Sequence, residues 1–430
     1  MSIFSYIKNY YQKNNKANQF AKLSIVTLIT IPIGIVTNIL LTKYLSVEDY
    51  GNYMFILGIF NFTIVIFTLG FFQACNRALV LNNDAKKAKE YYGTGLLILI
   101  SIFIVMSAFL FAYAFFDVNL KQKSIEKIFL FSIPIGSIFL LLSYFENLFQ
   151  ADNKIELLAQ SRILPKLIFL IVLYSFPFLY DEFSLDSLGN ILLIYFCTQM
   201  TACLFIIYKI NISISSVKTR FKEIWAYNKS FGLNVYYGSI FAVGFSALTG
   251  VLIGYFGYNN SGVGFYAIAL SFSMPLMFIP NTIATTYYKD FASSKNIGSK
   301  LIYVTIVLSL LALIAVWIIV PPFVNFFYGE AYNSVVKINF ILSIGSILHG
   351  MGDFFNRFLG ANGQGRALRN SAFFVGAGLL IFSLLLIPKW GEYGASYAKL
   401  IAGLTYLISI LFYYVKFIKK NQLNNLPNEH

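Results

Sequence analysis

Three ionisable side chains recur at four-residue spacing in an otherwise apolar segment near the C-terminus. The stretch HGMGDFFNRFLGANGQGRALRNS, residues 349–371, carries His349, Asp353 and Arg357 before it becomes a Gly-rich, basic turn. If the apolar part is a helix, the three side chains lie on one face of it. Such a stripe can hold an anionic substrate through Arg357 and exchange a coupling ion through Asp353 and His349. In the alternative interpretation Asp353 and Arg357 pair with each other, and Arg357 extends its head to water.

Other ionisable residues interrupt apolar segments in a similar way. Glu146 is a second candidate for ion coupling, although a pair with Arg162 or Lys166 is the favoured interpretation. Lys166 must extend to the surface or face a wet cavity, because a charge deep in the bilayer costs about 2.5–3.5 kcal/mol. Lys399 is expected inside the last apolar segment, at the outer end of such a cavity.

Two more cations, Arg77 and Lys289, end apolar segments that occupy equivalent places in the two halves of the chain. They either meet lipid phosphates at the membrane surface or form, with Arg357, a cationic clamp for a diphosphate. In a clamp, arginine binds phosphate through two parallel hydrogen bonds and lysine acts as a point charge.

The composition indicates a membrane protein whose long apolar segments must hold these residues. The chain is 58% hydrophobic and 12% charged, and its mean hydropathy is +0.70. A soluble domain is usually about 25% charged. Three cysteines, Cys75, Cys197 and Cys203, indicate neither a disulfide framework nor a metal site. The chain contains neither a phosphate-binding GxxxxGK[ST] loop nor an HExxH zinc motif, so we expect a transporter, with no catalytic residues, metal or cofactor.

Twelve segments are long and apolar enough to cross a bilayer as helices, which takes roughly 20 residues each. They are residues 23–45, 50–74, 93–116, 128–149, 158–180, 187–208, 231–256, 262–287, 300–322, 336–359, 367–387 and 393–416. With this division, 25 of the 32 Lys and Arg residues fall on the side that holds both termini and 7 on the other. Because basic loops stay inside, we expect both termini in the cytoplasm. The net charge of +14 then reflects this bias and attraction to anionic membrane lipids, and nucleic-acid binding is not expected.

The chain divides into two halves of six segments. We expect an N-terminal lobe at 1–210, preceded by a short interfacial helix with Ile3 and Phe4 on its apolar face, and a C-terminal lobe at 231–430. The connection 211–230 is predicted to be a cytoplasmic amphipathic helix. Weak repeats support a parallel arrangement of the halves: Gly51 and Tyr53 align with Gly264 and Tyr266 at an offset of 213.

Five stretches carry a family resemblance. They are KYLSVEDYGNYMF (43–55), FFQACNRALV (71–80), LFQADNKI (148–155), FFYGEAYNSVVKINFILSIG (326–345) and the long stretch LGANGQG to SYAKLI (359–401). The chain resembles the polysaccharide-transporter branch of the multidrug/oligosaccharidyl-lipid/polysaccharide flippase superfamily, and is most similar to O-antigen flippases of the Wzx type. The resemblance implies an all-α fold of twelve transmembrane helices, in two six-helix bundles related by pseudo-two-fold symmetry and forming a V around a central cavity.

The resemblance also implies a function. Such proteins move an undecaprenyl-diphosphate-linked glycan from the inner to the outer leaflet of the cytoplasmic membrane. We expect a monomer, with membrane lipids and the glycan polymerase and chain-length machinery as partners. The alternative is a cation-coupled exporter of drugs or small metabolites in the same superfamily. A membrane-embedded glycosyltransferase or polymerase is disfavoured, because the outer loops are too short for a catalytic domain.

Overall fold

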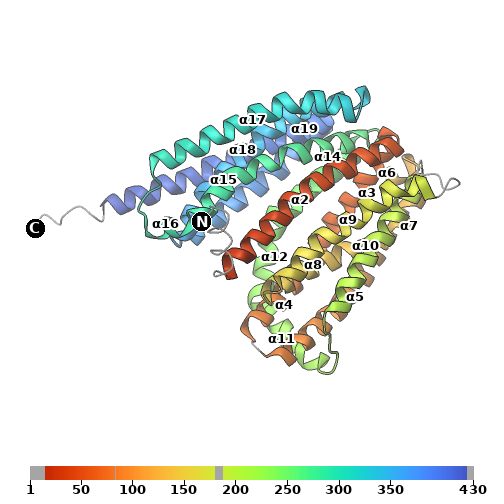
Figure 1. Ribbon diagram of the computed structural model, residues 1–430, viewed down its shortest axis with the longest axis horizontal. Coiled ribbons are helices and arrows are strands. Elements are labelled where there is room, and N and C mark those ends of the chain that lie inside the picture. Colours follow the sequence, from red (N-terminus) through yellow and green to blue (C-terminus); the bar gives the residue numbers. More distant parts are fainter. Residues whose placement is uncertain (1–14, 83, 180–186, 424–430) are drawn as a thin grey trace, which may run out of the picture. The chain divides into compact units, whose positions relative to one another are not determined.

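The computed structural model describes residues 15–82, 84–179 and 187–423, and every regular element in these ranges is a helix (Figure 1). This agrees with the all-α prediction, since a segment in hydrocarbon must bond its own backbone groups. Most of the predicted interfacial helix, with Ile3 and Phe4, lies outside the described residues. The helices are α2 (Asn15–Tyr44), α3 (Val47–Phe67), α4 (Phe71–Leu81), α5 (Ala85–Phe116), α6 (Val118–Gln122), α7 (Glu126–Ser132), α8 (Ile135–Ala151), α9 (Ile155–Leu179), α10 (Leu188–Lys209), α11 (Val217–Tyr227), η1 (Asn228–Gly232), α12 (Leu233–Ser239), η2 (Ile240–Gly244), α13 (Phe245–Phe256), α14 (Ser261–Ser273), α15 (Pro275–Thr286), α16 (Tyr288–Ser293), α17 (Ser299–Phe327), η3 (Glu330–Tyr332), α18 (Asn333–Ala361) and α19 (Gly365–Leu423).

Nine of the described helices are long and apolar enough to cross a membrane, and a tenth span follows if the bent pair α7 and α8 is counted as one. Two features separate this count from the predicted twelve. The segment predicted at 231–256 is divided into η1, α12, η2 and α13, where η1 and η2 are π-helical. In addition, α19 covers two predicted segments at once. The count of twelve therefore stays a prediction.

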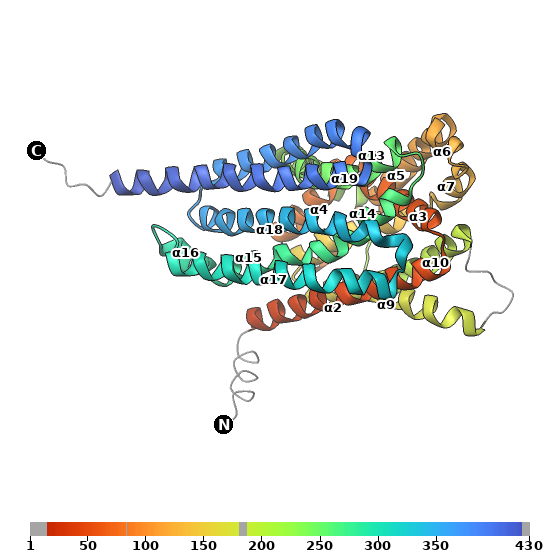
Figure 2. The same cartoon turned by 90° about the horizontal axis from the view of Figure 1, so that it is seen from above.

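The helix α19 is a hairpin of two arms. Gly391 interrupts it with φ 53° and ψ −130°, a conformation that glycine adopts most easily. Beyond this point the chain turns back, so that Ser371 and Ser409 lie 3.0 Å apart between their hydroxyl oxygens. Nearby, the Asn370 side-chain amide donates to the Tyr413 hydroxyl at 2.9 Å. The two arms run side by side in Figure 2 and coincide with the segments predicted at 367–387 and 393–416.

The chain forms two compact units. The first unit comprises Met1–Leu45 and Thr63–Tyr237, and the second comprises Ser46–Phe62 and Gly238–His430. The first part of α3 therefore groups with the second unit, although it lies early in the sequence. The predicted lobe boundaries, 1–210 and 231–430 with the connection 211–230, stay a prediction.

A close backbone crossing explains why α3 joins the second unit. A Cβ atom on Gly51 would lie 2.0 Å from the carbonyl oxygen of Asn260, so only glycine fits here. The Asn260 side-chain amide donates to Asn52 Oδ1 at 2.7 Å, and both residues are buried. A Cβ atom on Gly264 would lie 3.4 Å from the Cα atom of Gly51. The two glycines that align in the sequence repeat thus pack against each other.

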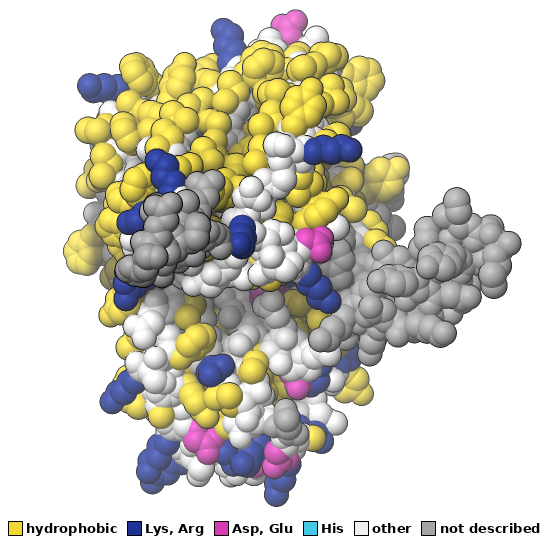
Figure 3. Space-filling view, turned by 90° about the vertical axis from the view of Figure 1, so that its left-hand side faces the viewer, with side chains coloured by type: hydrophobic (Ala, Val, Ile, Leu, Met, Phe, Trp, Pro, Cys, Tyr) yellow, Lys and Arg dark blue, Asp and Glu magenta, His cyan; other side chains and the backbone are white. Residues whose placement is uncertain are grey.

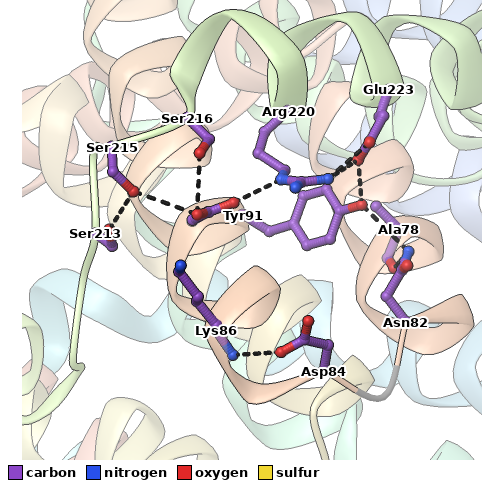
Figure 4. Close-up of polar contacts among 11 residues, drawn as sticks. Ala78, Asn82, Asp84, Lys86, Tyr91, Ser213, Ser215, Ser216, Arg220 and Glu223 are labelled. Atoms are coloured by element: carbon purple, nitrogen blue, oxygen red, sulfur yellow. Dashed lines mark hydrogen bonds and ion pairs between the residues drawn. The ribbon is translucent and has the colours of Figure 1, made fainter.

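The helix α11 occupies the predicted connection and is held to the first unit by charged hydrogen bonds (Figure 4). Arg220 donates through Nε to Glu90 Oε2 at 2.7 Å and through Nη1 to Glu223 at 2.6 Å. The Tyr91 hydroxyl also donates to Glu223. Ser216 donates to the other Glu90 oxygen at 3.0 Å. We call Glu90, Tyr91, Arg220 and Glu223 the linker cluster; it fixes α11 across the start of α5.

Replacing Gly51 by alanine tests the crossing of α3. The new methyl group would overlap the Asn260 backbone, and overpacking of this kind costs about 1–3 kcal/mol. We expect a lower Tm for Gly51→Ala in detergent. The control is Gly58→Ala in the same helix, where the nearest atom to a new Cβ is Val251 Cγ2 at 3.8 Å. Alanine favours helix over glycine, so the control should keep or raise the Tm. Equal Tm values for the two variants would contradict this packing.

The linker cluster predicts a pH-dependent contribution to stability. Burial raises the pKa of Glu223, but the hydrogen bonds from Tyr91 and Arg220 outweigh it and the pKa lies below its usual value. A carboxyl with a lowered pKa stabilises the folded state above its unfolded pKa of about 4.3, and this contribution disappears as the pH falls. Glu223→Gln should therefore lower the Tm by a few degrees at neutral pH, and the difference from wild type should shrink below about pH 4. Glu156→Gln, at an exposed acid of the same unit, is the control. A Glu223→Gln difference that stays constant over this pH range would overturn the assignment.

Candidate functional site

A cavity of about 230 Å³ in the second unit collects three of the residues predicted from the sequence. His349 and Asp353, predicted for ion coupling, line it together with Lys399, predicted for substrate binding. The cavity lies among η2, α13, α18 and both arms of α19. Its other lining residues are Phe241, Ser246, Ala372, Val375, Gly376, Leu379, Ala402 and Tyr406. Ligand pockets usually have about 300–1,000 Å³, so this cavity suits a small ion and not an oligosaccharide.

Tyr406 organises the acidic side of this cavity. Its hydroxyl donates to Asp353 Oδ1 at 3.0 Å, and its ring packs on the His349 ring with centroids 4.8 Å apart. Tyr406 is 5% exposed and lies close to Gly352, where a Cβ atom would be 2.4 Å away from its ring. Asp353 is therefore held by a hydroxyl from the second arm of α19. Tyr406 was not among the residues predicted for the site, although its spacing of seven residues from Lys399 places both on one helix face.

Asp353 and Arg357 do not form the pair that the alternative interpretation predicted. Arg357 is exposed, and its Nε donates to Asn281 Oδ1 on α15 at 3.2 Å. The direct ion pairs found among the described residues involve other side chains. The pair does not form because each side chain has a partner from another helix, which the sequence spacing does not reveal. The exposed position of Arg357 agrees with the rest of that interpretation. Arg357 remains available to an anion.

Glu146 has one of the two partners expected for it. Arg162 of α9 binds the Glu146 carboxylate of α8 through two nitrogens, with Nε to Oε2 at 3.1 Å and Nη2 to Oε1. This two-point geometry matches the fork of a guanidinium to a carboxylate. The pair occupies the Glu146 carboxylate, while Lys166, one turn beyond Arg162, is exposed. A coupling role for Glu146 would require this pair to open.

The predicted cations Arg77 and Lys289 are both exposed. Arg77, on α4 of the first unit, lies over the Phe231 ring with its guanidinium carbon 5.7 Å from the centroid. Lys289 is on α16 of the second unit, as Arg357 is on α18. Figure 3, which views the molecule from the side of α16, shows more Lys and Arg side chains than Asp and Glu on that face. A joint cationic site of Arg77, Lys289 and Arg357 stays a prediction, since they belong to different units.

In the part of the chain that the structure describes, no three His, Cys, Asp or Glu side chains gather in a way that could hold a metal ion. Cys75, Cys197 and Cys203 are free thiols. Asp353, His349 and Lys399 line the cavity of the second unit, and ionisable groups of this kind can exchange a small cation or a proton.

Solved structures share this fold. The "Lipid II flippase MurJ, inward closed conformation" matches with a TM-score of 0.67 and 15% identity, over 93% of this chain and 90% of that chain. A multidrug resistance MATE family transporter of the MOP superfamily, in its inward-facing conformation, matches with a TM-score of 0.65 and 12% identity, over 95% and 100%. The MATE multidrug transporter DinF-BH matches with a TM-score of 0.59 and 15% identity, over 92% and 94%. At such identities the likeness shows the fold alone.

Sequence comparison supplies the family. Among curated protein sequences, none is similar enough to count as a relative. The family model described as "Polysaccharide biosynthesis protein" matches residues 17–288, which is more than half of the chain. The chain is a multi-pass membrane protein with the fold of the flippases and exporters named above, and it belongs to the polysaccharide biosynthesis protein family.

Proposed function

We propose that this protein is a flippase that moves an undecaprenyl-diphosphate-linked oligosaccharide, such as an O-antigen repeat unit, from the inner to the outer leaflet of the cytoplasmic membrane. The observation that carries the proposal is the family match over residues 17–288, which concerns polysaccharide biosynthesis. The fold shared with a lipid II flippase supports it, because lipid II is also a lipid-linked glycan. Both termini are in the cytoplasm in this proposal, and the protein acts as a monomer that passes its product to the glycan polymerase and chain-length machinery.

Exposed cations of the chain compensate the charge of the cargo in this mechanism. A diphosphate cannot cross hydrocarbon without compensating charge, because burying an unpaired charge is strongly unfavourable. Arg77, Lys289 and Arg357 supply that charge, with Lys166 as a further exposed cation of the first unit. Within the described ranges, carboxylates bind Lys154, Arg162 and Arg220 and none of these four cations, which supports their assignment to the substrate.

The cavity of the second unit supplies the coupling. Asp353 binds the coupling cation or proton, with His349 beside it and the Tyr406 hydroxyl orienting its carboxylate. The Lys399 side chain lines the same cavity, and a positive charge on it opposes the binding of a cation there. Filling and emptying this small site therefore changes the charge balance between α18 and both arms of α19. A ligand can shift a protein between two conformations only if it binds one of them more tightly than the other.

A cation-coupled exporter of drugs or small metabolites is the second candidate. It is supported by the fold shared with a MATE transporter and by the single acidic residue in the cavity. The two candidates differ in the charge of the cargo, since exported drugs are mostly cationic or neutral and the lipid diphosphate is anionic. The exposed cations Arg77, Lys289 and Arg357 favour the anionic cargo.

Alanine substitution of Arg77 and of Arg357 tests the cationic residues. Loss of one hydrogen bond to a charged group costs about 1.5–3 kcal/mol, which is about tenfold or more in rate. We expect each variant to reduce surface-glycan export by at least that factor at normal membrane levels, and lysine to restore it in part. The control is Arg369→Ala, since Arg369 is also exposed but lies outside the proposed set. Normal export by both Arg77→Ala and Arg357→Ala would show that they are only membrane anchors.

Substitution of Asp353 tests the coupling site. Asp353→Asn keeps the shape but removes the charge that exchanges a cation, so export should fall at every pH while the protein level is unchanged. Tyr406→Phe should change the dependence of export on pH or on the cation gradient, because it removes only the hydrogen bond to Asp353. Asp290→Asn, at an exposed acid of α16, serves as the control. If Asp353→Asn exports at the wild-type rate over the whole pH range, Asp353 has no coupling role.

A further inference from the structure

An apolar groove of about 440 Å³ runs beneath α11 in the first unit, outside the proposed transport site. It is bounded by the end of α3, the start of α4, the first half of α5 and one side of α11. Its lining consists of Phe67, Leu69, Phe71, Thr94, Leu97, Ile98, Ser101, Ile102, Val105, Val217 and Phe221. The groove has the volume of roughly fifteen water molecules at about 30 Å³ each, and a methylene group is of similar size. It can therefore hold much of one acyl chain.

The groove is built by the linker cluster. Arg220 of α11 donates to Glu90 of α5. The backbone N–H of Ser213, before α11, donates to the Lys89 carbonyl at 3.0 Å. A Cβ atom on Gly93 would lie 2.2 Å from the Ser213 carbonyl oxygen, so this approach requires glycine. Because these contacts hold α11 at a fixed height over α5, the groove is part of the folded unit.

Two observations indicate what the groove binds. The outer face of α11 carries exposed Lys218 and Lys222, while the nearby acids Glu90 and Glu223 are both occupied by Arg220. Lys218 and Lys222 directly follow the lining residues Val217 and Phe221, and their two positive charges exceed the single negative charge that Glu90, Glu223 and Arg220 leave together. Within the groove, Thr94 is 1% exposed and its hydroxyl has no hydrogen-bond partner among the described residues. A lipid offers the three matching parts: an apolar chain, an ester oxygen and an anionic headgroup.

We propose that this groove is a binding site for one anionic phospholipid of the surrounding bilayer. An acyl chain lies between α5 and α11, the Thr94 hydroxyl donates to an ester carbonyl, and the phosphate headgroup meets Lys218 and Lys222. Trp225 reports on the site, since its ring stacks on Phe71 at 5.7 Å and on Phe221 at 6.4 Å between centroids, and both phenylalanines line the groove. The bound lipid would hold α11 in the plane of the membrane surface.

Quenching of Trp225 by brominated lipids tests the proposal. The chain has three tryptophans, Trp225, Trp317 and Trp390, so the double variant Trp317→Phe/Trp390→Phe leaves only Trp225. It is reconstituted into vesicles of unlabelled phosphatidylcholine that contain a small fraction of brominated phosphatidylglycerol or of brominated phosphatidylcholine. A lysine near the surface contributes about fivefold to anionic lipid affinity. We expect phosphatidylglycerol to be favoured by at least fivefold, and Lys218→Gln/Lys222→Gln to abolish the preference.

Further variants separate a site from general lipid contact. Ser101→Phe fills the groove and should weaken quenching by both lipids. A protein that keeps only Trp390, which lies on α19 of the second unit, should show no preference for phosphatidylglycerol. If the Trp variants do not fold, native mass spectrometry of the wild type and of Lys218→Gln/Lys222→Gln gives the same comparison as retained phosphatidylglycerol.

Three results would overturn the proposal. Equal quenching by the two lipids would show ordinary contact with bulk lipid. A phosphatidylglycerol preference that survives Lys218→Gln/Lys222→Gln would place the headgroup elsewhere. Displacement of phosphatidylglycerol by trace undecaprenyl phosphate would assign the groove to the polyprenyl lipid instead of a bilayer phospholipid.

Discussion

The cost of placing charge among apolar helices is the constraint on which the rest of this structure depends. A helix in hydrocarbon bonds its own backbone, but an ionisable side chain there needs a partner or a wet cavity. The chain meets this need in separate ways. Glu146 is paired with Arg162, Asp353 is hydrogen-bonded by Tyr406 beside a small cavity, and Glu90 is bound by Arg220 near the start of α5. Arg357 remains exposed.

Close backbone approaches make these partnerships possible. Asp353 reaches Tyr406 because α18 packs tightly on the second arm of α19, where a Cβ on Gly403 would lie 2.6 Å from the Gly345 carbonyl oxygen. The Glu90–Arg220 pair forms in the same way, because Gly93 lets the chain before α11 cross the start of α5. Small residues at crossings thus bring polar groups from distant parts of the sequence within hydrogen-bond distance, as is common in membrane proteins.

The sequence predicts the helices well because apolar length is a local property. Helices α2, α5 and α17 contain the predicted segments 23–45, 93–116 and 300–322, apart from at most one residue at an end. Helix α5 begins earlier than predicted, because the polar stretch from Ala85 continues the helix beyond its apolar part. The partners of charged residues depend on tertiary contacts and were predicted less well. The Glu146–Arg162 pair was expected, but the Asp353–Arg357 pair was wrong, and Tyr406 was missed because a tyrosine in an apolar helix carries no distinctive pattern. The linker cluster was missed too, since its members lie up to 133 positions apart in the printed sequence.

The central claim is that the cargo is an anionic lipid-linked glycan. The most direct test uses purified protein in vesicles that carry an undecaprenyl-diphosphate-linked oligosaccharide. A glycosidase added outside the vesicles cleaves only the glycan that faces it, and the cleaved fraction is measured. We expect the protein to raise this fraction above that of protein-free vesicles, and the Arg357→Ala protein to raise it less. The opposite result would be an unchanged accessible fraction in vesicles where the same protein transports a cationic dye. It would contradict the flippase function and favour the exporter.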